Sequence, residues 1–485
     1  MRRTAPFLPS VPIALACARL MRGLPHLALL LLATACALPG ATDDGAGPRS
    51  PEAPTQAERV YARVSPAVAY VDTPLSTGTA VLVAPERMLT NAHVLWPQDS
   101  VRLVFPDGRE VERARVLVQD ALRDLALIEV PGIGTSQDSV APLPLADAED
   151  LPIGAPVYLV GYPAEMELFP QPAITRGILS LRRHWDAGDL TYLQTDAAIA
   201  GGQSGGALVD GEGRMIGVSG LIFGEGGFAL AADATAALAH LARIESGRDK
   251  EANAALRTLP VASPEMGGAR QSTQRVDLAE PFAEASFVFY PEFGEAVEVE
   301  ASPGAGVDVF LELLSPYGDL EVEADEQGAA GVEQGRFTAL SSGPHVLVIG
   351  RIDGNARGAN VPVVASHPLL RLADPDDGRR LAPGDGIVAS LEHPGDIDIF
   401  ELRTTGEQEV VITVDTANFV PDLLLEPLDG DEDAPLIPGA SGEGNALGLA
   451  SRAVLPAGSA ARWSVRIADM DGVAQGGYFL HVEAR

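Results

Sequence analysis

Cysteine is nearly absent from this 485-residue chain, which contains only Cys17 and Cys36. If the segment before Cys36 is removed, the remaining chain cannot form an internal disulfide. The sequence also lacks zinc-ligand spacing, a phosphate-binding loop and a dinucleotide fingerprint. We therefore expect no cofactor and no metal. Because 46% of the residues are hydrophobic, we expect ordinary packed cores instead.

Basic residues are scarce as well. The chain has 34 lysines and arginines against 67 aspartates and glutamates, which gives a net charge of −33. The arginines Arg2, Arg3, Arg19 and Arg22 precede the first acidic residue, so the rest of the chain is more acidic still. Such a surface repels nucleic acid and anionic lipid headgroups. We expect no nucleic-acid partner, and the length predicts two to four domains.

The N-terminus has an apolar segment that is too short to span a membrane. Leu27–Leu32 follows the basic segment Met21–His26 and precedes Ala33–Ala35, which has the small-residue pattern of a cleavage site. We therefore predict that residues 1–36 form an export signal. The pattern is complete from Met21 onward, so Met21 is the expected start, with a long basic leader as the alternative.

Cys36 follows the cleavage pattern directly and resembles the acylated cysteine of a bacterial lipobox. The resemblance implies lipidation of Cys36 and membrane attachment through its acyl chains, and Ala37 then favours the outer membrane. Ala33 stands where these signals usually have leucine, so plain secretion with a spare cysteine is the alternative. The expected location is outer-membrane lipoprotein or periplasmic or extracellular protein.

The middle of the chain predicts an all-β domain between two linkers. Residues 37–57 and 246–275 have the glycine and proline content of flexible linkers. Between them, residues 58–245 consist of short β-type runs broken by glycine and proline. Asp233 is the expected N-cap of a closing helix at 234–244. The clearest strands are expected at 79–83, 101–105, 111–118, 125–130, 157–160 and 216–221.

The C-terminal half contains a degenerate repeat of alternating strands. We expect two β-sandwich modules, at 276–370 and 371–485. They resemble bacterial pre-peptidase C-terminal domains, which implies substrate- or surface-binding attachments that cleavage can remove. The matching strands are 286–289, 307–313 and 346–349 in the first copy, and 398–402, 421–426 and 463–467 in the second.

Three polar residues of the middle domain form a candidate catalytic set. The glycines of Gly201–Gly206 allow a sharp turn at Ser204, which can point the N–H groups of Gly202 and Ser204 into one oxyanion hole. By itself, a glycine-rich turn that contains a serine is more often a hairpin turn than a catalytic site. His93 ends a predicted strand, and Asp124 enters an apolar strand, where a buried carboxylate needs a partner. The order His, Asp, Ser is that of chymotrypsin-type proteases.

Over residues 58–245 the chain resembles HtrA-type (Deg) serine proteases. The family usually has Asn-Pro-Gly-Asn before the serine, whereas this chain has Gly201 in place of the proline, which loosens the oxyanion loop through backbone entropy. We find no PDZ pattern after residue 245. The resemblance rests on Leu89–Val94, Arg123–Leu127, Gly161–Pro163, Thr175–Ser180, and Leu193–Ile199 leading into Gly202–Gly206.

This resemblance implies a chymotrypsin-like double β-barrel for residues 58–245. With the two β-sandwich modules expected from the repeat, the whole chain is expected to be all-β. The resemblance also implies a serine-type endopeptidase with His93, Asp124 and Ser204 as catalytic triad and protein or peptide substrates. Ala198 stands where this class places the floor of the specificity pocket, and Phe228 is expected in a wall. Because no acid is present there, we predict a small or medium aliphatic residue before the cleaved bond.

Two other functions remain open at this point. One is a catalytically inactive protease-fold binding protein of the cell envelope, and the other is an esterase with the same triad. The complete triad weighs against the first. The absence of a strand-to-helix nucleophile elbow weighs against the second.

For several other polar residues we expect structural or solvent-exposed positions rather than functional roles. We expect Asp196 to tie down its loop, and His184 and Trp185 to lie at an exposed loop tip. Asp308 and Asp422 are expected to be hydrogen-bonded turn aspartates rather than calcium ligands. The acidic residues within 429–433 are expected in a solvated loop.

Overall fold

The structure is a computed structural model that describes residues 53–485 with twelve gaps. The export signal, Cys36 and most of both predicted linkers lie outside the described residues, as does the acidic segment 429–433. No described helix combines the length and hydrophobicity that crossing a membrane requires. The gaps are 137–139, 165–169, 224–227, 249–271, 279–283, 326–327, 329–330, 352–359, 373–375, 377, 429–435 and 443–444.

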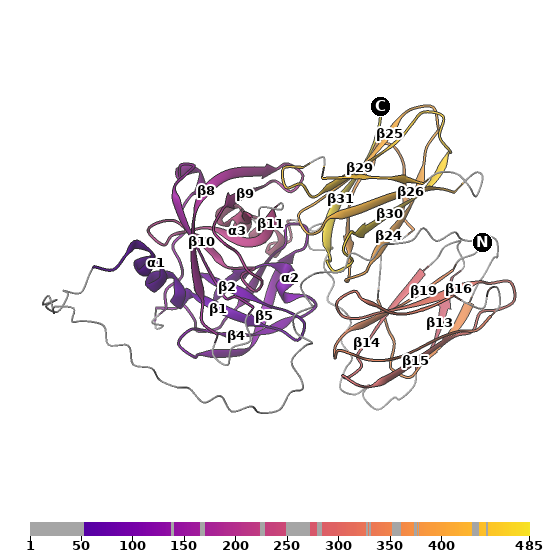
Figure 1. Cartoon of the computed structure of the whole chain (residues 1–485), viewed down its shortest axis with the longest axis horizontal. Coiled ribbons are helices and arrows are strands. Elements are labelled where there is room, and N and C mark those ends of the chain that lie inside the picture. The colour runs from indigo at the N-terminus through magenta and orange to yellow at the C-terminus, as the bar shows by residue number, and fades with distance from the viewer. Residues whose placement is uncertain are drawn as a thin grey trace, which may run out of the picture. The chain divides into compact units, whose positions relative to one another are not determined.

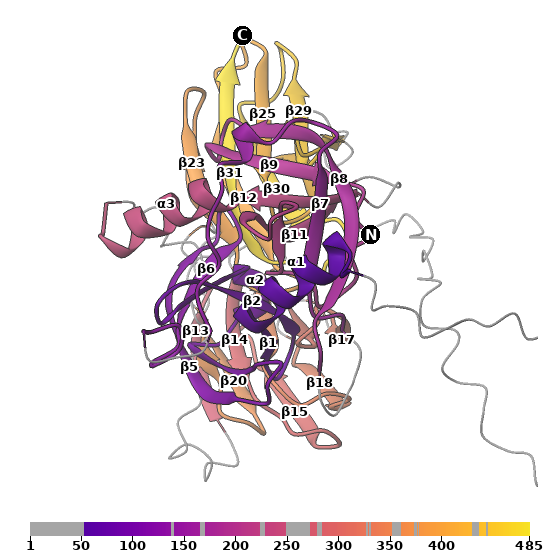
Figure 2. The ribbon, with the colours of Figure 1, turned by 90° about the vertical axis from the view of Figure 1, so that its left-hand side faces the viewer.

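Two closed six-stranded barrels form the first half of the described chain (Figures 1 and 2). The first barrel has the strand order β1-β2-β3-β6-β5-β4, and the second has the order β10-β11-β12-β9-β8-β7. All six strands expected from the sequence in this region are present. Strands of the first barrel are β1 (Val68–Asp72), β2 (Thr77–Ala84), β3 (Arg87–Thr90), β4 (Ser100–Val104), β5 (Glu110–Asp120) and β6 (Leu125–Glu129). Strands of the second are β7 (Pro156–Gly161), β8 (Ala173–Trp185), β9 (Leu190–Thr195), β10 (Ala207–Val209), β11 (Met215–Phe223) and β12 (Phe228–Asp233).

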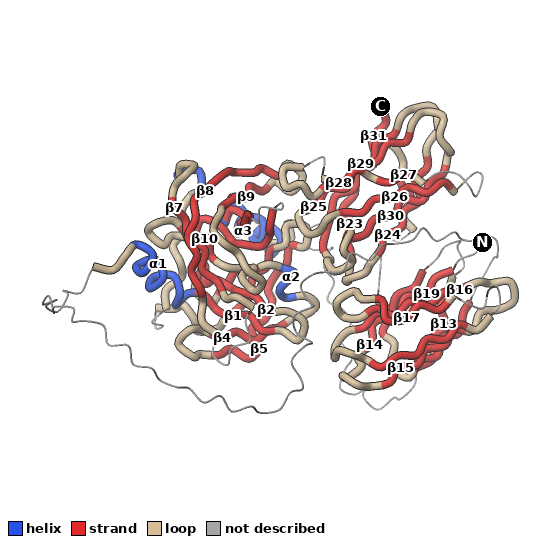
Figure 3. The backbone as a smooth tube through the Cα atoms, viewed as in Figure 1, coloured by secondary structure: helices blue, strands red, loops and turns tan. Residues whose placement is uncertain are grey.

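Short helices accompany the barrels, as the blue segments of Figure 3 show. Helix α1 (Gln56–Val64) begins inside the segment predicted as linker, because Thr55 and Glu58 form a reciprocal capping box. Helix α3 (Ala234–Glu245) confirms the predicted closing helix, and Asp233 caps it by accepting a hydrogen bond from the Ala236 N–H at 2.8 Å. Three other short turns are η1 (Ser65–Ala67), α2 (Ala92–Leu95) and η2 (Ala148–Asp150).

The first β-sandwich follows the barrels and begins at Ser272, within the segment predicted as linker. Its two sheets have the strand orders β13-β20-β15-β18 and β17-β16-β19-β14-β21. Apolar side chains from both sheets, such as Phe287, Val299 and Leu311, fill its core. Its strands are β13 (Ser272–Asp277), β14 (Glu284–Phe289), β15 (Ala296–Ala301), β16 (Val309–Leu314), β17 (Leu320–Ala324), β18 (Glu333–Thr338), β19 (His345–Arg351), β20 (Asn360–Ala365) and β21 (Leu370–Arg371).

The second β-sandwich has sheets β22-β24-β30-β26-β27 and β23-β31-β25-β29-β28. Its core is also formed by both sheets, with Phe400, Ile412 and Val465 among its buried residues. Its strands are β22 (Arg380–Leu381), β23 (Gly386–Leu391), β24 (Ile397–Arg403), β25 (Val410–Thr416), β26 (Pro421–Pro427), β27 (Ile437–Pro438), β28 (Ala440–Ser441), β29 (Ala450–Leu455), β30 (Arg462–Asp469) and β31 (Gly476–Ala484).

The two sandwiches share one topology. In the first, β19 pairs antiparallel with β14 and β16; in the second, β30 pairs antiparallel with β24 and β26. The opposite sheets also correspond, since β13-β20-β15-β18 matches β23-β31-β25-β29 in order. The sequence repeat aligns β14, β16 and β19 with β24, β26 and β30, so the repeat in the sequence corresponds to a repeat in the fold.

The second sandwich is docked against the second barrel through Trp185. The expectation that Trp185 lies at an exposed loop tip is wrong, because this side chain is fully buried at the end of β8. Its Nε1–H donates to Asp415 Oδ1 at 2.7 Å, and its ring meets Phe479 edge-on at 6.0 Å. The neighbouring His184 side chain keeps 52% exposure.

Candidate active site

His93 lies in the one-turn helix α2, directly after strand β3 of the first barrel. Asn91, the residue before this turn, donates from Nδ2 to the carbonyl oxygen of Asp124 at 2.8 Å. Both Asn91 and Asp124 are buried, so this hydrogen bond fixes the two segments to each other. The side chain of His93 keeps 38% exposure and faces outward from this support.

Asp124 immediately precedes strand β6 and adopts a left-handed backbone with φ of 56°. Such a conformation is costly for a residue other than glycine and persists only when its surroundings hold it. A buried ion pair supplies that hold, since Arg123 Nη1 lies 2.8 Å from Asp120 Oδ2 and both side chains are at least 92% buried. The Arg123 backbone N–H also donates to Asp120 Oδ1 at 3.1 Å.

Two hydrogen bonds join the histidine to the aspartate. Asp124 Oδ2 lies 2.7 Å from His93 Nδ1, and Asp124 Oδ1 accepts from the His93 backbone N–H at 2.9 Å. Burial lowers the pKa of His93, but the charge and hydrogen bond of Asp124 raise it, and the net pKa lies above its ordinary value. The pairing therefore orients the imidazole with Nδ1 toward the carboxylate and Nε2 on the opposite side of the ring.

Ser204 is half-buried in the glycine-rich loop before strand β10. Gly202 and Gly205 have φ of 83° and 82°, values that other residues rarely adopt. A Cβ atom at Gly205 would overlap the carbonyl oxygen of Thr79, and one at Gly202 would lie 2.7 Å from the carbonyl oxygen of Tyr162. The loop therefore needs glycine at both positions to bring the serine backbone this close to its neighbours.

Thr79 of strand β2 ties the serine loop to the histidine segment. Its N–H donates to the carbonyl oxygen of Ser204 at 2.8 Å, and its hydroxyl donates to that of Gly202 at 2.9 Å. Its own carbonyl oxygen accepts from the Thr90 hydroxyl at 2.7 Å. Thr90 ends β3, three residues before His93, so one fully buried threonine sets the spacing of both loops.

Two further hydrogen bonds brace the loop on the other side of the serine. The Ser219 hydroxyl donates to the carbonyl oxygen of Gln203 at 2.6 Å. The Gln203 side-chain oxygen accepts from the Ala200 N–H at 2.7 Å. Gln203 and Ser219 are both buried, and such bonds are worth more when water is excluded.

The predicted specificity-pocket residues lie in the second barrel. Ala198 is exposed after β9, and its carbonyl oxygen accepts from the Thr175 hydroxyl at 2.7 Å. Phe228 begins β12 and is half-buried. Their roles stay predictions. Asp196 accepts a hydrogen bond from the Ile178 N–H at 2.7 Å, a contact that ties its loop to β8.

A cavity of about 550 Å³ opens beside His93 and Asp124. Gly220 and Leu221 of β11 line its barrel side. Its remaining walls include residues of both sandwiches, which sequence reasoning did not connect with the site. Neither Ala198 nor Phe228 is among the described residues that line this cavity.

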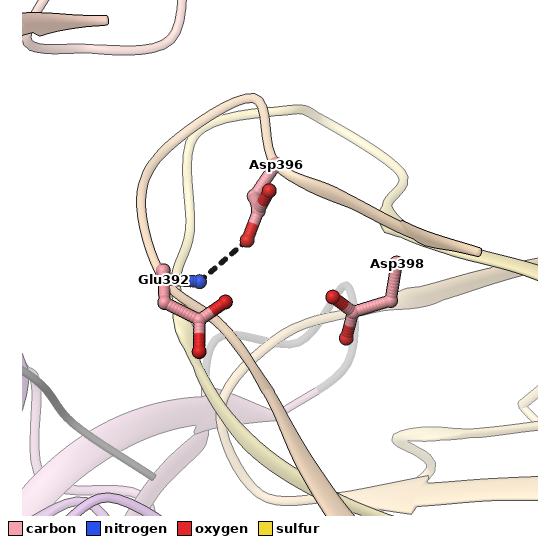
Figure 4. Close-up of side chains that lie close together, drawn as sticks. All are labelled: Glu392, Asp396 and Asp398. Atoms are coloured by element: carbon pink, nitrogen blue, oxygen red, sulfur yellow. Dashed lines mark hydrogen bonds between the residues drawn. The ribbon is translucent and has the colours of Figure 1, made fainter. Parts of the chain in front are cut away.

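Three buried carboxylates also lie together in the second sandwich, within 4.8 Å of one another (Figure 4). Glu392 N–H donates to Asp396 at 2.6 Å, Ser390 donates to Glu392 at 2.8 Å, and the Tyr478 hydroxyl donates to Asp398. Burial and the Asp398 charge raise the pKa of Tyr478, which keeps its phenol a donor. Asp308 is half-buried before β16, and Asp422 is exposed within β26 rather than in a turn.

Comparison with known proteins points to one class. Residues 78–218 match the family model of the trypsin-like peptidase domain. This span contains His93, Asp124 and Ser204. The similarity supports a serine-type hydrolase.

Particular relatives carry serine protease names. The chain is 32% identical over 155 residues to "Probable periplasmic serine endoprotease DegP-like" of Halomonas elongata, covering 31% of each chain. It is 31% identical to serine protease PepD of Mycobacterium tuberculosis, covering 35% of this chain and 39% of that one. A solved structure of the HtrA-type protease AlgW with a tripeptide is 30% identical over 40% of this chain and 64% of that chain, with a TM-score of 0.35. The chain thus spans about a third of the length of these curated relatives.

Proposed function

We propose that this protein is an exported serine endopeptidase that cleaves peptide bonds of proteins or peptides. The observation that supports it most is the double hydrogen bond between Asp124 and His93, in a loop arrangement that Thr79 ties to Ser204. A nucleophile, a base and an orienting acid are the parts that acyl transfer by serine requires.

In the proposed mechanism, His93 Nε2 takes the proton from the Ser204 hydroxyl as its oxygen attacks the carbonyl carbon of the substrate. The protonated imidazole then gives this proton to the leaving amine, and the acyl group remains on Ser204. A water molecule then attacks the acyl carbon while His93 Nε2 takes its proton. The carboxylic acid product leaves, and Ser204 regains its hydroxyl proton from His93. Asp124 keeps the proton on Nδ1 and stabilises the imidazolium, which agrees with the raised pKa of His93.

The negative charge that develops on the substrate oxygen needs nearby donors. We assign this role to the backbone N–H groups of Gly202 and Ser204. One such donor contributes roughly 10²–10³ in rate. Gly201 adds conformational freedom to this loop, so part of the binding energy of the substrate is used to order it.

Export and membrane attachment belong to the same proposal. The signal pattern in residues 1–36 motivates it, and one relative is named as periplasmic. We propose that Cys36 is acylated after cleavage of the signal. Mass spectrometry of the mature N-terminus checks this. A free thiol at Cys36, or a mature chain that begins at another residue, contradicts lipidation and leaves the peptidase proposal unchanged.

Labelling by a fluorophosphonate probe tests the catalytic part. We expect wild-type protein to be labelled and Ser204→Ala to be unlabelled. Ser180→Ala is the matched control, because Ser180 is another half-buried barrel serine whose hydroxyl points only at the Ile178 carbonyl oxygen, 3.5 Å away.

Digestion of casein then separates the candidate functions. Labelling with cleavage of casein supports an endopeptidase. Labelling with hydrolysis of ester substrates alone points to an esterase. Absence of labelling points to an inactive binding protein.

A further inference from the structure

The cavity beside His93 is shared by three parts of the chain. His93, Asp124 and Leu221 line it from the barrels, Tyr317 from the first sandwich, and Val473 from the second. Its volume of about 550 Å³ falls in the range of pockets that bind small ligands or side chains. A site that contains the proposed catalytic base is therefore bounded by residues from outside the peptidase domain.

Tyr317 is held in place by the turn that carries it. The Ser315 hydroxyl accepts hydrogen bonds from the N–H groups of Tyr317 and Asp319, both at 3.1 Å. The Ser315 N–H donates to the Asp319 carbonyl oxygen at 2.8 Å, which closes the turn. Ser315 is buried, whereas Tyr317 keeps 48% exposure. A rigid turn thus presents a large, half-exposed aromatic ring to the cavity.

Val473 is held in the same way by a different residue. The side chain of Asp469 is largely buried and accepts from the N–H groups of Val473 at 2.9 Å and Ala474 at 3.0 Å. Val473 itself is 59% exposed. An exposed valine on a braced turn loses little conformational entropy when an apolar group covers it.

These two turns are fixed relative to each other and to the barrels. A Cβ atom on Gly318 would overlap the carbonyl oxygen of Gly472, so the turns meet backbone to backbone. Asn418 Nδ2 donates to the carbonyl oxygens of Ala121 at 2.9 Å and Gly477 at 2.6 Å. Ala121 lies just before Asp124, so this amide connects the second sandwich to the loop that carries the proposed catalytic acid.

We propose that the cavity is a substrate subsite and that Tyr317 and Val473 are specificity-determining residues. Its occupant is an apolar side chain of the polypeptide substrate, close to the cleaved bond on the side where His93 and Leu221 line the cavity. Asp124 is the one acidic residue among the described lining residues, and it is engaged by His93, so a basic side chain finds no free counter-charge there. This inference rests on the proposed function.

Two internally quenched peptides with the same residues at the cleaved bond test the proposal on the full-length protein. One is a short peptide of about four residues, and the other has about twelve residues and carries leucine and phenylalanine on both sides. We expect Tyr317→Ala and Val473→Asp to lower kcat/KM for the long peptide about 10-fold more than for the short one, because each removes apolar contact surface.

Matched controls lie on the same sandwiches but do not line the cavity. Leu320→Ala and Val454→Asp change apolar residues with 51% and 37% exposure, and we expect the ratio of the two peptides to stay as in the parent. Equal losses for both peptides, an unchanged ratio in Tyr317→Ala, or faster cleavage of the long peptide would each overturn the proposal. The last outcome would mean that the turns obstruct the cleft.

Binding separates this inference from the catalytic proposal. In a Ser204→Ala background, fluorescence anisotropy measures the Kd of the long peptide without cleavage. We expect Tyr317→Ala to weaken binding about 10-fold. If the wild-type protein is not labelled by the fluorophosphonate but the peptide binds and Tyr317→Ala weakens it, the catalytic proposal fails and the subsite stands. If the Ser204→Ala protein does not bind the peptide, the subsite fails.

Discussion

Two of the places where the structure buries acidic residues differ in what surrounds the carboxylates. In the first barrel, Asp124 bonds to His93, whose side chain keeps 38% exposure beside a cavity. In the second sandwich, Glu392, Asp396 and Asp398 are all buried, and the hydroxyl and N–H donors around them are local. A buried carboxylate is suited to chemistry when its partner still reaches a substrate. When all the partners are buried as well, the network instead holds the fold.

The largest effect that tests this contrast is expected for Asp124→Asn. We expect kcat to fall about 10⁴-fold, because the amide no longer holds the required tautomer of His93. The acid limb of the pH profile should also move to lower pH. His93 must be neutral to accept a proton, and Asp124 raises its pKa, so removing the carboxylate lowers the pH at which activity is lost.

The pH profile of kcat/KM measures this shift. Asp186→Asn is the control, because its side chain is fully exposed just past the end of β8 in the second barrel. An acid limb that stays in place in Asp124→Asn would show that Asp124 does not set the pKa of the base.

A smaller effect is expected where the second barrel meets the second sandwich. Trp185→Ala should lower the free energy of unfolding by about 3–5 kcal/mol, the usual range for a fully buried tryptophan. It should also loosen the docking of the second sandwich, seen as a larger radius of gyration in X-ray scattering.

The control is Trp463→Ala, which alters a tryptophan buried inside the second sandwich. It should lower stability without enlarging the folded protein. Docking does not depend on Trp185 if both variants leave the radius of gyration as it is in the parent.

The smallest effect is expected inside the acidic network of the second sandwich. Tyr478→Phe removes the buried hydroxyl that donates to Asp398 and should cost about 1–3 kcal/mol in urea unfolding. Tyr192→Phe is the matched control: the hydroxyl of this buried tyrosine has no hydrogen-bond partner among the described residues, so its loss should cost little. Equal costs in the two variants would argue against a stabilising role for the network.

Much of the fold was predictable because its signals are local. The barrel strands, the Asp233 cap and the sandwich repeat all follow from alternation, turn residues and capping within a few residues. The candidate site also left a local trace, since His93 and Ser204 each stand in a distinctive segment. The structure adds the direct contact between His93 and Asp124.

Other parts of the site have no such trace. Thr79 is one threonine in an apolar strand, and only the folded chain shows that it holds two loops. Trp185 was misinterpreted because its partners, Asp415 and Phe479, lie more than two hundred residues away in the sequence. Tyr317 could not be assigned for the same reason: its position next to the cavity depends on how whole domains pack.

The hydrogen bond from Asn418 to the Ala121 carbonyl oxygen has a consequence for a protein that is cleaved between the barrels and the sandwiches. A cut after α3 would remove the C-terminal half of the chain. The Ala121 carbonyl oxygen and the indole of Trp185 would then be exposed to water. The shortened protein would then have a newly exposed apolar patch around Trp185. The loop that contains Ala121 and Asp124 would also be held less tightly. On the subsite proposal, such a cut would also change which substrates bind, because it would remove Tyr317 and Val473 from the cavity.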